Sequence, residues 1–169
     1  MPVPFELRPD MPEEGLSAEA NGLRHSEHVE QHLLADAREV GHPMVLPDHV
    51  PKTHLAMAMA ELARDKGTDS YDAVHHAIFS AYYGEGRDIG SKAVLLEIAA
   101  AHGLDAREVS TAWDTGTYDE RLHVFAQLAL SLGVSTTPSA LLCNKLVVGM
   151  RPYGVLREAM KDCVGGNTS

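Results

Sequence analysis

The segment from Gly133 to Gly149 constrains the fold of this 169-residue chain more than any other. It reads Gly-Val-Ser-Thr-Thr-Pro and continues as Ser-Ala-Leu-Leu-Cys-Asn-Lys-Leu-Val-Val-Gly. Proline cannot donate a hydrogen bond to a β-ladder and restricts the residue before it, so a proline directly before an apolar strand is unusual. We therefore predict a helix, a turn at Thr137–Pro138 and a hairpin. A cis bond at this proline would mark a tight turn that leaves backbone groups free to face a ligand.

Most of the chain shows helical rather than strand periodicity. Strands are predicted at Pro2–Leu7, Ser139–Leu142 and Leu146–Met150. Helices are predicted from about Ser26 to Val40, Thr53 to Lys66, Ser70 to Tyr83, Ser91 onward, Asp105 onward, Thr117 to Leu132 and Pro152 to Gly165. One face of the first helix is predicted to carry Val29, Leu33, Ala37 and Val40. Capping boxes are predicted for Asp105 with Glu108 and for Thr117 with Glu120.

The order of helix, Thr-Pro turn, hairpin and last helix resembles the C-terminal half of a thioredoxin fold. Segments that resemble DsbA-like proteins of the FrnE branch are Phe5–Gly15, Pro51–Ala56, Phe79–Gly90 and Gly103–Asp105. The resemblance implies an α/β, thioredoxin-like (DsbA-like) fold with a large helical insertion and thiol-disulfide oxidoreductase chemistry. It implies one domain over residues 1–169, with the insertion at 16–116 and the C-terminal thioredoxin half at 117–165.

The cysteines depart from the family pattern. DsbA-like oxidoreductases carry Cys-x-x-Cys after their first strand, whereas this chain has only Cys143 and Cys163. The chain therefore resembles a member in which the first βα unit is absent, unless the true start of the protein lies upstream of Met1. The absent strand would be central, and unpaired buried backbone groups cost roughly 1 to 3 kcal/mol each. We expect the gap to be filled by re-pairing or by a second chain, most simply in a homodimer.

Three residues are candidates for substrate binding. In the family, the proline that matches Pro138 is cis, and the residue before it, here Thr137, offers its backbone to an extended peptide or a thiol ligand. An ordinary rigid turn is the alternative. His54 lies in a block that resembles the family and could face the same groove, although a capping or solvated role is also open. No catalytic residue is assigned.

The remaining chemistry-bearing side chains give weaker signals. Both cysteines are expected to be free thiols without a catalytic role, because a reactive thiolate needs a lowered pKa and usually a second thiol. A helical face carries His25, His28 and His32, but without a cysteine partner or a His-Glu-x-x-His motif no metal is predicted. No cofactor is predicted, with glutathione as the one open alternative. Packing and surface pairing are expected for Tyr82, Tyr83 and Arg87.

Charge and hydropathy exclude several classes of partner. The net charge is −10, which argues against nucleic acid and anionic membranes as partners. No apolar run approaches the roughly 20 residues that span a bilayer. Since the first residues lack a basic region and an apolar signal core, a cytoplasmic location is predicted.

Three functions follow from these observations. The first is a DsbA/FrnE-type protein that is inactive in disulfide exchange as this chain. The second is a glutathione-dependent enzyme of the 2-hydroxychromene-2-carboxylate isomerase or kappa glutathione transferase type. The third is a non-catalytic, dimeric binding protein that uses the groove at Pro138.

Overall fold

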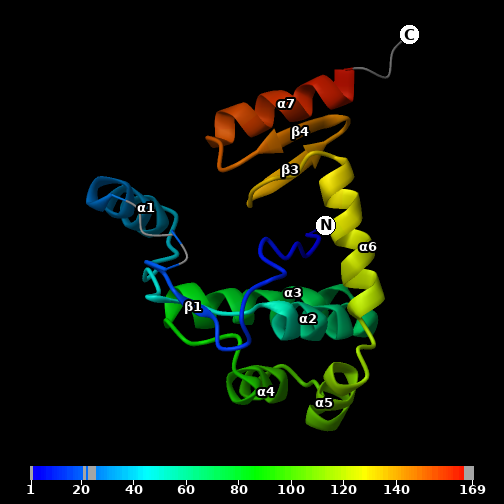
Figure 1. Cartoon of the computed structure of the whole chain (residues 1–169). Helices are drawn as coiled ribbons and strands as arrows, with labels where there is room; N and C mark the ends of the chain where they lie inside the picture. Colours follow the sequence, from blue (N-terminus) through cyan, green and yellow to red (C-terminus); the bar gives the residue numbers. More distant parts are fainter. Residues whose placement is uncertain (1, 21, 23–25, 166–169) are drawn as a thin grey trace. The chain divides into compact units, whose positions relative to one another are not determined.

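A computed structural model of the protein describes residues 2–20, 22 and 26–165, with side chains in the last helix as far as Lys161. The chain forms two units, Arg8–Glu120 (unit 2) and Met1–Leu7 with Arg121–Ser169 (unit 1), each of which is considered by itself. The elements, in order, are β1 (Leu16–Ser17), α1 (Glu27–Glu39), β2 (His49–Val50), α2 (His54–Lys66), α3 (Thr68–Phe79), the π-helix η1 (Ser80–Gly84), α4 (Lys92–Ala101), α5 (Ala106–Asp114), α6 (Asp119–Ser131), β3 (Ser139–Leu142), β4 (Lys145–Val148) and α7 (Tyr153–Gly165) (Figure 1).

The core of unit 2 is built around α2, which packs against α3, α4 and α5. Each of these helices contributes a fully buried side chain: Met59, Val74, Leu95 and Val109. Alanines of α2 such as Ala56 and Ala63 are also buried, and their small side chains permit close approach of the neighbouring helices. The apolar periodicity of these segments therefore predicted the helices correctly.

Local signals account for several helix ends of unit 2. Asp105 caps α5, and its Oδ1 accepts hydrogen bonds from the backbone N–H groups of Arg107 and Glu108 at 2.9 and 3.0 Å. Between α2 and α3 the chain turns at Gly67, whose φ of 129° favours glycine. The second predicted capping box is wrong, since α6 begins at Asp119 and the Thr117 hydroxyl instead contacts that of Thr115 at 2.7 Å.

The first strand pair of the structure differs from the predicted strand. Residues 2–7 form no strand, and a physical reason is that Pro2 and Pro4 have no N–H to donate to a ladder. Instead β1 pairs with β2 in antiparallel register, Leu16 with Val50. This pairing joins segments far apart in the sequence, so local periodicity gave no sign of it.

The apolar face of α1 is not buried in the described structure. None of its residues is buried, and Val29 and Val40 are 42% and 69% exposed. The helix itself is where the sequence placed it, with Ser26 as N-cap residue. Its amphipathic pattern predicted the helix, whereas burial of the apolar face depends on a neighbouring element.

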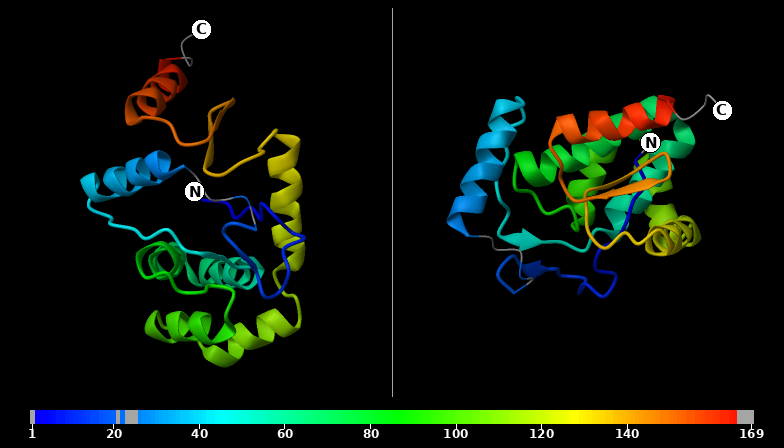
Figure 2. Two further views of the ribbon diagram at one scale, coloured as in Figure 1. Left: turned by 60° about the vertical axis from the view of Figure 1, so that its left-hand side comes forward. Right: turned by 90° about the horizontal axis from the view of Figure 1, so that it is seen from above.

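Unit 1 contains the predicted hairpin and last helix. The strands β3 and β4 pair antiparallel, with Ser139 opposite Val148 and Leu142 opposite Lys145, and α7 packs on β3 (Figure 2). The connection is shorter than predicted, since Lys145 belongs to β4 and only Cys143 and Asn144 form the turn.

Unit 1 has little core of its own. Among its described residues, Leu122 is the only buried apolar one. The large apolar side chains exposed by 41% or more are Val3, Leu7, Val124, Leu128, Leu130, Leu132, Leu141, Met150, Tyr153, Val155 and Met160. An exposed set of this size is typical of a surface that another element covers. None of the helices in the described part of the chain is long and apolar enough to cross a membrane.

Candidate functional site

The turn at Thr137–Pro138 connects α6 to β3. Gly133, with φ of 80°, ends α6, because its N–H donates to the Leu130 carbonyl at 3.0 Å and the Val134 N–H donates to the Ala129 carbonyl at 2.9 Å. This pair of bonds is the Schellman arrangement that glycine favours after a helix. The chain therefore leaves α6 at a fixed point, five residues before Pro138.

The two predicted binding residues lie on the surface of unit 1. Thr137 and Pro138 are both exposed, and the peptide bond between them is cis. The hydroxyl of Ser139 donates to the Thr136 carbonyl at 2.6 Å, which closes the turn from the strand side. The site is therefore an exposed backbone turn that leads directly into a strand.

The strand β3 has an edge without a strand partner in the described structure, since the second sheet contains only β3 and β4. In a two-residue hairpin the closing pair, Leu142 with Lys145, exchanges hydrogen bonds, and the pairs then alternate. The backbone N–H and C=O groups of Ser139 and Leu141 therefore face the open edge. An extended peptide could add to this edge by main-chain hydrogen bonds.

His54 lies in unit 2, at the first residue of α2. Its Nε2 lies 3.0 Å from Oδ1 of Asp119, which forms an ion pair when the imidazole is protonated. The pair joins the N-terminus of α2 to that of α6, and the His54 side chain is 31% exposed. Asp119 therefore holds the side chain of His54 in position. The sequence did not indicate this pair, because 65 positions separate the two residues.

The expectation of free thiols is wrong for Cys143, which is disulfide-bonded. Cys143 is exposed at the turn of the hairpin and has a φ of 57°, a left-handed conformation that is uncommon for residues other than glycine. The side chain of Cys163 lies outside the part of the chain that the structure describes. The sequence alone did not predict that Cys143 is oxidised, because the two cysteines are far apart along the chain.

The histidines of α1 supply no metal site that the structure describes. His28 and His32 form an edge-to-face contact with ring centroids 4.5 Å apart, and His25 lies outside the described residues. Within the described residues, no group of three or more metal-ligating side chains comes together. The helical spacing of these histidines thus produces a ring contact between two of them.

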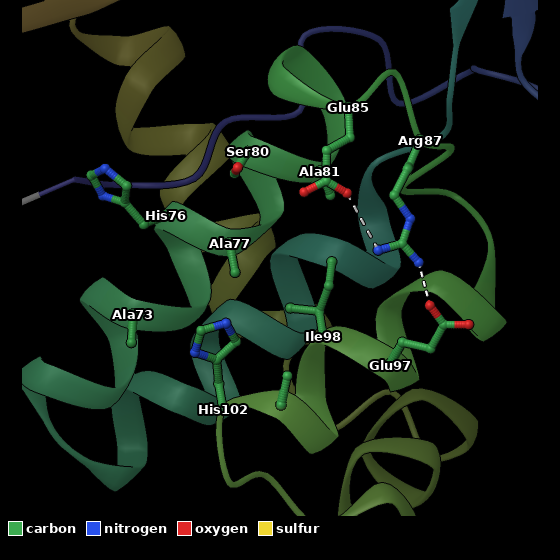
Figure 3. Close-up of a pocket in the computed structure, with 11 residues that line it drawn as sticks. Ala73, His76, Ala77, Ser80, Ala81, Glu85, Arg87, Glu97, Ile98 and His102 are labelled. Atoms are coloured by element: carbon green, nitrogen blue, oxygen red, sulfur yellow. Dashed lines mark hydrogen bonds and ion pairs between the residues drawn. The ribbon is translucent and has the colours of Figure 1, made fainter. Parts of the chain in front are cut away.

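Unit 2 has a groove that the sequence analysis did not identify. It lies between α3, η1 and α4, with a volume of about 680 Å³ (Figure 3). Its floor includes Ala73, Ala77 and Ala81, whose four-residue spacing on one helical face could have indicated it. At the rim, Arg87 makes ion pairs with Glu85 and Glu97. Because two carboxylates already hold the guanidinium of Arg87, its charge is compensated without a ligand.

The tyrosines next to this groove have structural roles, as expected. The Tyr82 hydroxyl donates to the His49 carbonyl at 3.0 Å, and burial, with smaller contributions from Tyr83 and Asp88, raises the pKa of Tyr82 to about 12. The hydroxyl therefore stays protonated at neutral pH and fastens β2 to η1. Burial also raises the pKa of Tyr83.

The sequence matches the family model of the DSBA-like thioredoxin domain over residues 3–161. The chain belongs to that family. Among solved structures, this DSBA-like chain is similar to a probable DsbA oxidoreductase from Streptomyces coelicolor, with a TM-score of 0.85 and 22% sequence identity. The alignment covers 98% of this chain and 75% of the other. No match was found among curated protein sequences.

Family membership and the structural likeness confirm the predicted DsbA-like thioredoxin fold, in a form that is mostly helical with small sheets. The FrnE branch and the absence of the first βα unit stay predictions. A fold can host many functions, so the activity of this DSBA-like chain has to be argued from its own residues.

Proposed function

We propose that the protein is a DsbA/FrnE-type member of the thiol-disulfide oxidoreductase family whose 169 residues do not catalyse disulfide exchange by the family mechanism. One observation carries this proposal: the family match spans residues 3–161, yet these residues contain no Cys-x-x-Cys pair. Catalytic exchange needs an accessible thiolate with a lowered pKa and a second thiol that resolves the mixed disulfide. Cys143 and Cys163, the two cysteines of the chain, lie too far apart in the sequence to form such a motif.

Reduction of insulin by dithiothreitol tests the proposed inactivity. The purified chain is expected to leave the rate of insulin precipitation at the value for dithiothreitol alone. Cys143→Ser serves as the matched variant and is expected to give the same rate. A rate increase that the wild-type chain shows and Cys143→Ser lacks would contradict the proposal and identify Cys143 as a catalytic thiol.

We further infer that Thr137, Pro138 and His54 serve ligand binding rather than electron transfer. The exposed cis turn at Thr137–Pro138 supports an extended peptide as ligand, because the turn lies on the surface of unit 1 and leads directly into a strand. This observation favours the non-catalytic binding protein as the second candidate function. A cytoplasmic location remains a prediction, and the disulfide at Cys143 is evidence against it, since disulfides persist mainly in oxidising compartments.

We infer that a second copy of the chain covers the open edge of β3 in a homodimer. Two observations support this: a sheet of two strands is marginal by itself, and Leu141 on the edge strand is 50% exposed. The exposed apolar side chains of unit 1 also support a dimer. A dimer that pairs the two β3 edges would satisfy the exposed backbone groups of both copies.

Sedimentation velocity at low micromolar concentration tests the dimer. Wild-type protein is expected to sediment as a dimer, and Leu141→Lys is expected to sediment as a monomer, because a charge on an edge strand opposes pairing. Val40→Lys, which alters a side chain 69% exposed at the end of α1, is the matched control and should stay dimeric. A folded, monomeric wild-type protein would exclude the dimer.

A further inference from the structure

The groove between α3, η1 and α4 of unit 2 is a surface that the proposed function does not use. Its floor carries Ala73, Ala77, Ala81 and Ile98 and is therefore apolar (Figure 3). We propose that the groove docks a helical segment of a partner protein, whose apolar face lies on the floor and whose lysine or arginine side chains lie near both ends. This inference does not depend on the proposed function, since it involves neither a cysteine nor the turn at Pro138.

The shape of the groove favours a helix over a small molecule. From α3 into η1, Ala73, Ala77 and Ala81 repeat at four-residue spacing, and each projects only a methyl group. A ridge of side chains on a second helix can pack along such a row at close range. Ala73 and Ala101, at the margins of the groove, are exposed, so its walls do not enclose a ligand as a small-molecule site does.

Exposed carboxylates stand at both ends of the alanine row. Asp69 precedes Ala73 by one helical turn, in the first turn of α3, and Glu85 follows Ala81 at the other end of the row. Because a helix rises 1.5 Å per residue, these two acidic positions lie roughly 24 Å apart along the helix axis. A partner helix with a basic side chain near each end therefore matches the groove in both length and charge.

The end of the groove at η1 stays negative although Arg87 lies there. The side chains of Glu85 and Glu97 are 56% and 69% exposed, whereas that of Arg87 is 33% exposed. Two carboxylates outnumber one guanidinium, and a carboxylate has lone pairs for more than one donor. Charge complementarity therefore favours a basic partner. It disfavours a second copy of the chain, because the chain carries a net charge of −10.

The π-helix η1 forms the wall at this end. The Glu85 N–H donates to the Ser80 carbonyl at 3.0 Å, a bond that spans five residues instead of the four of an α-helix, and the Arg87 N–H donates to the Ala81 carbonyl at 2.8 Å. All four of these residues line the groove. Single π-helical turns are frequent at functional sites, so the position of η1 also supports a binding role for the groove.

Fluorescence anisotropy with the full chain tests the docking site. The probe is a dye-labelled synthetic peptide of about 18 residues, with alanine and leucine on one helical face and lysine near both ends. This basic peptide is expected to bind at submillimolar concentration. A counterpart with glutamate in place of lysine is expected to bind at least roughly tenfold more weakly, because its charges repel those at the ends of the groove. Added salt should weaken the basic peptide, since the charges are exposed.

Substitutions place the peptide in the groove. Ala77→Leu fills the floor and is expected to weaken binding of the basic peptide roughly tenfold, because overpacking opposes close approach. Ala35→Leu makes the same change at an exposed position of α1 and is the matched control, which should bind as wild type does. If Ala77→Leu loses its helical circular dichroism, Ala73→Leu, at an exposed position of the same row, takes its place.

Charge substitutions test the two ends of the groove. Asp69→Asn and Glu85→Gln are each expected to weaken the basic peptide about two- to fivefold, the range of an exposed ion pair. Each variant should also show a smaller response to salt. Asp36→Asn, at an exposed position of α1, is the matched control and should not change the affinity.

Three results would overturn the docking site. The first is a basic peptide that does not bind at submillimolar concentration, or binds no better than its acidic counterpart. The second is an affinity that the leucine variants of the groove leave unchanged, since the peptide would then lie elsewhere on the chain. The third is a wild-type dimer that Ala77→Leu converts to a folded monomer in sedimentation velocity, since a second copy of the chain would then be the occupant of the groove.

Discussion

The carboxylate of Glu61 lies in the core of unit 2, and its side chain has no exposed surface. One of its partners is Arg64, whose Nε donates to the two carboxylate oxygens at 3.0 and 3.1 Å. The guanidinium also lies 3.7 Å from the ring centroid of Tyr71. A charge buried this deeply is tolerated only with a partner, because removing the partner leaves the desolvation penalty uncompensated.

Substitution of Arg64 by methionine is therefore expected to lower the free energy of unfolding by about 3 to 5 kcal/mol. Urea titration followed by circular dichroism measures this loss. The double variant Glu61→Leu with Arg64→Met should be more stable than Arg64→Met alone, since no buried charge remains. Arg107→Met, at an exposed position of α5, is the control and should change little. A loss for Arg64→Met below about 1 kcal/mol, the range of surface pairs, would contradict this account.

At the scale of single elements, the start of α5 shows how one side chain fixes a helix. Hydrogen bonds from the backbone N–H groups of Glu108 and Arg107 hold the pKa of Asp105 below its ordinary value of 3.8. A carboxyl with a lowered pKa in the folded protein stabilises the fold fully above its unfolded pKa, and the contribution is lost as the pH falls through the folded pKa. The cap is therefore at full strength at neutral pH and weakens in acid.

Replacement of Asp105 by asparagine tests this cap. The variant keeps an oxygen acceptor that does not titrate. As the pH drops below about 4, the melting temperature of wild type is therefore expected to fall more than that of Asp105→Asn. Asp105→Ala should melt lower than both at neutral pH. Thermal melts between neutral pH and pH 3 measure these differences. If the difference in melting temperature between wild type and Asp105→Asn stays constant over this pH range, the charge of the Asp105 carboxylate does not contribute to stability.

At the scale of the whole molecule, the two units differ in their capacity to fold alone. Unit 2 has a closed core with Met59, Leu95 and Val109 fully buried, whereas Leu122 is the only buried apolar residue among those described in unit 1. The segment Arg8–Glu120 is therefore expected to fold by itself. A peptide of residues 121–169 is expected to remain unfolded, because a hairpin and two helices with exposed apolar faces bury too little surface.

Both segments can be expressed separately and compared by circular dichroism and thermal melting. Residues 8–120 should give a helical spectrum and a cooperative transition, and residues 121–169 should give neither at low micromolar concentration. The full-length chain is the reference for both. A cooperative transition in the isolated 121–169 peptide would mean that unit 1 has a core that its exposed side chains do not suggest.

The sequence by itself determined the features that depend on short-range interactions. The helix end at Gly133, the cap at Asp105 and the hairpin after Pro138 are set by hydrogen bonds between residues a few positions apart, and the family resemblance rests on these segments. Helical periodicity likewise predicted α2, because the spacing of its apolar residues is a local pattern.

Tertiary structure alone decided the features that need a distant partner. Residues 2–7 have a strand-like pattern but form no strand, and the short strand at Leu16 pairs with Val50 instead. The His54–Asp119 pair and the oxidation of Cys143 likewise depend on which segments meet in space. A backbone hydrogen bond or a disulfide forms only when both groups come together, and a local sequence pattern does not specify the second group.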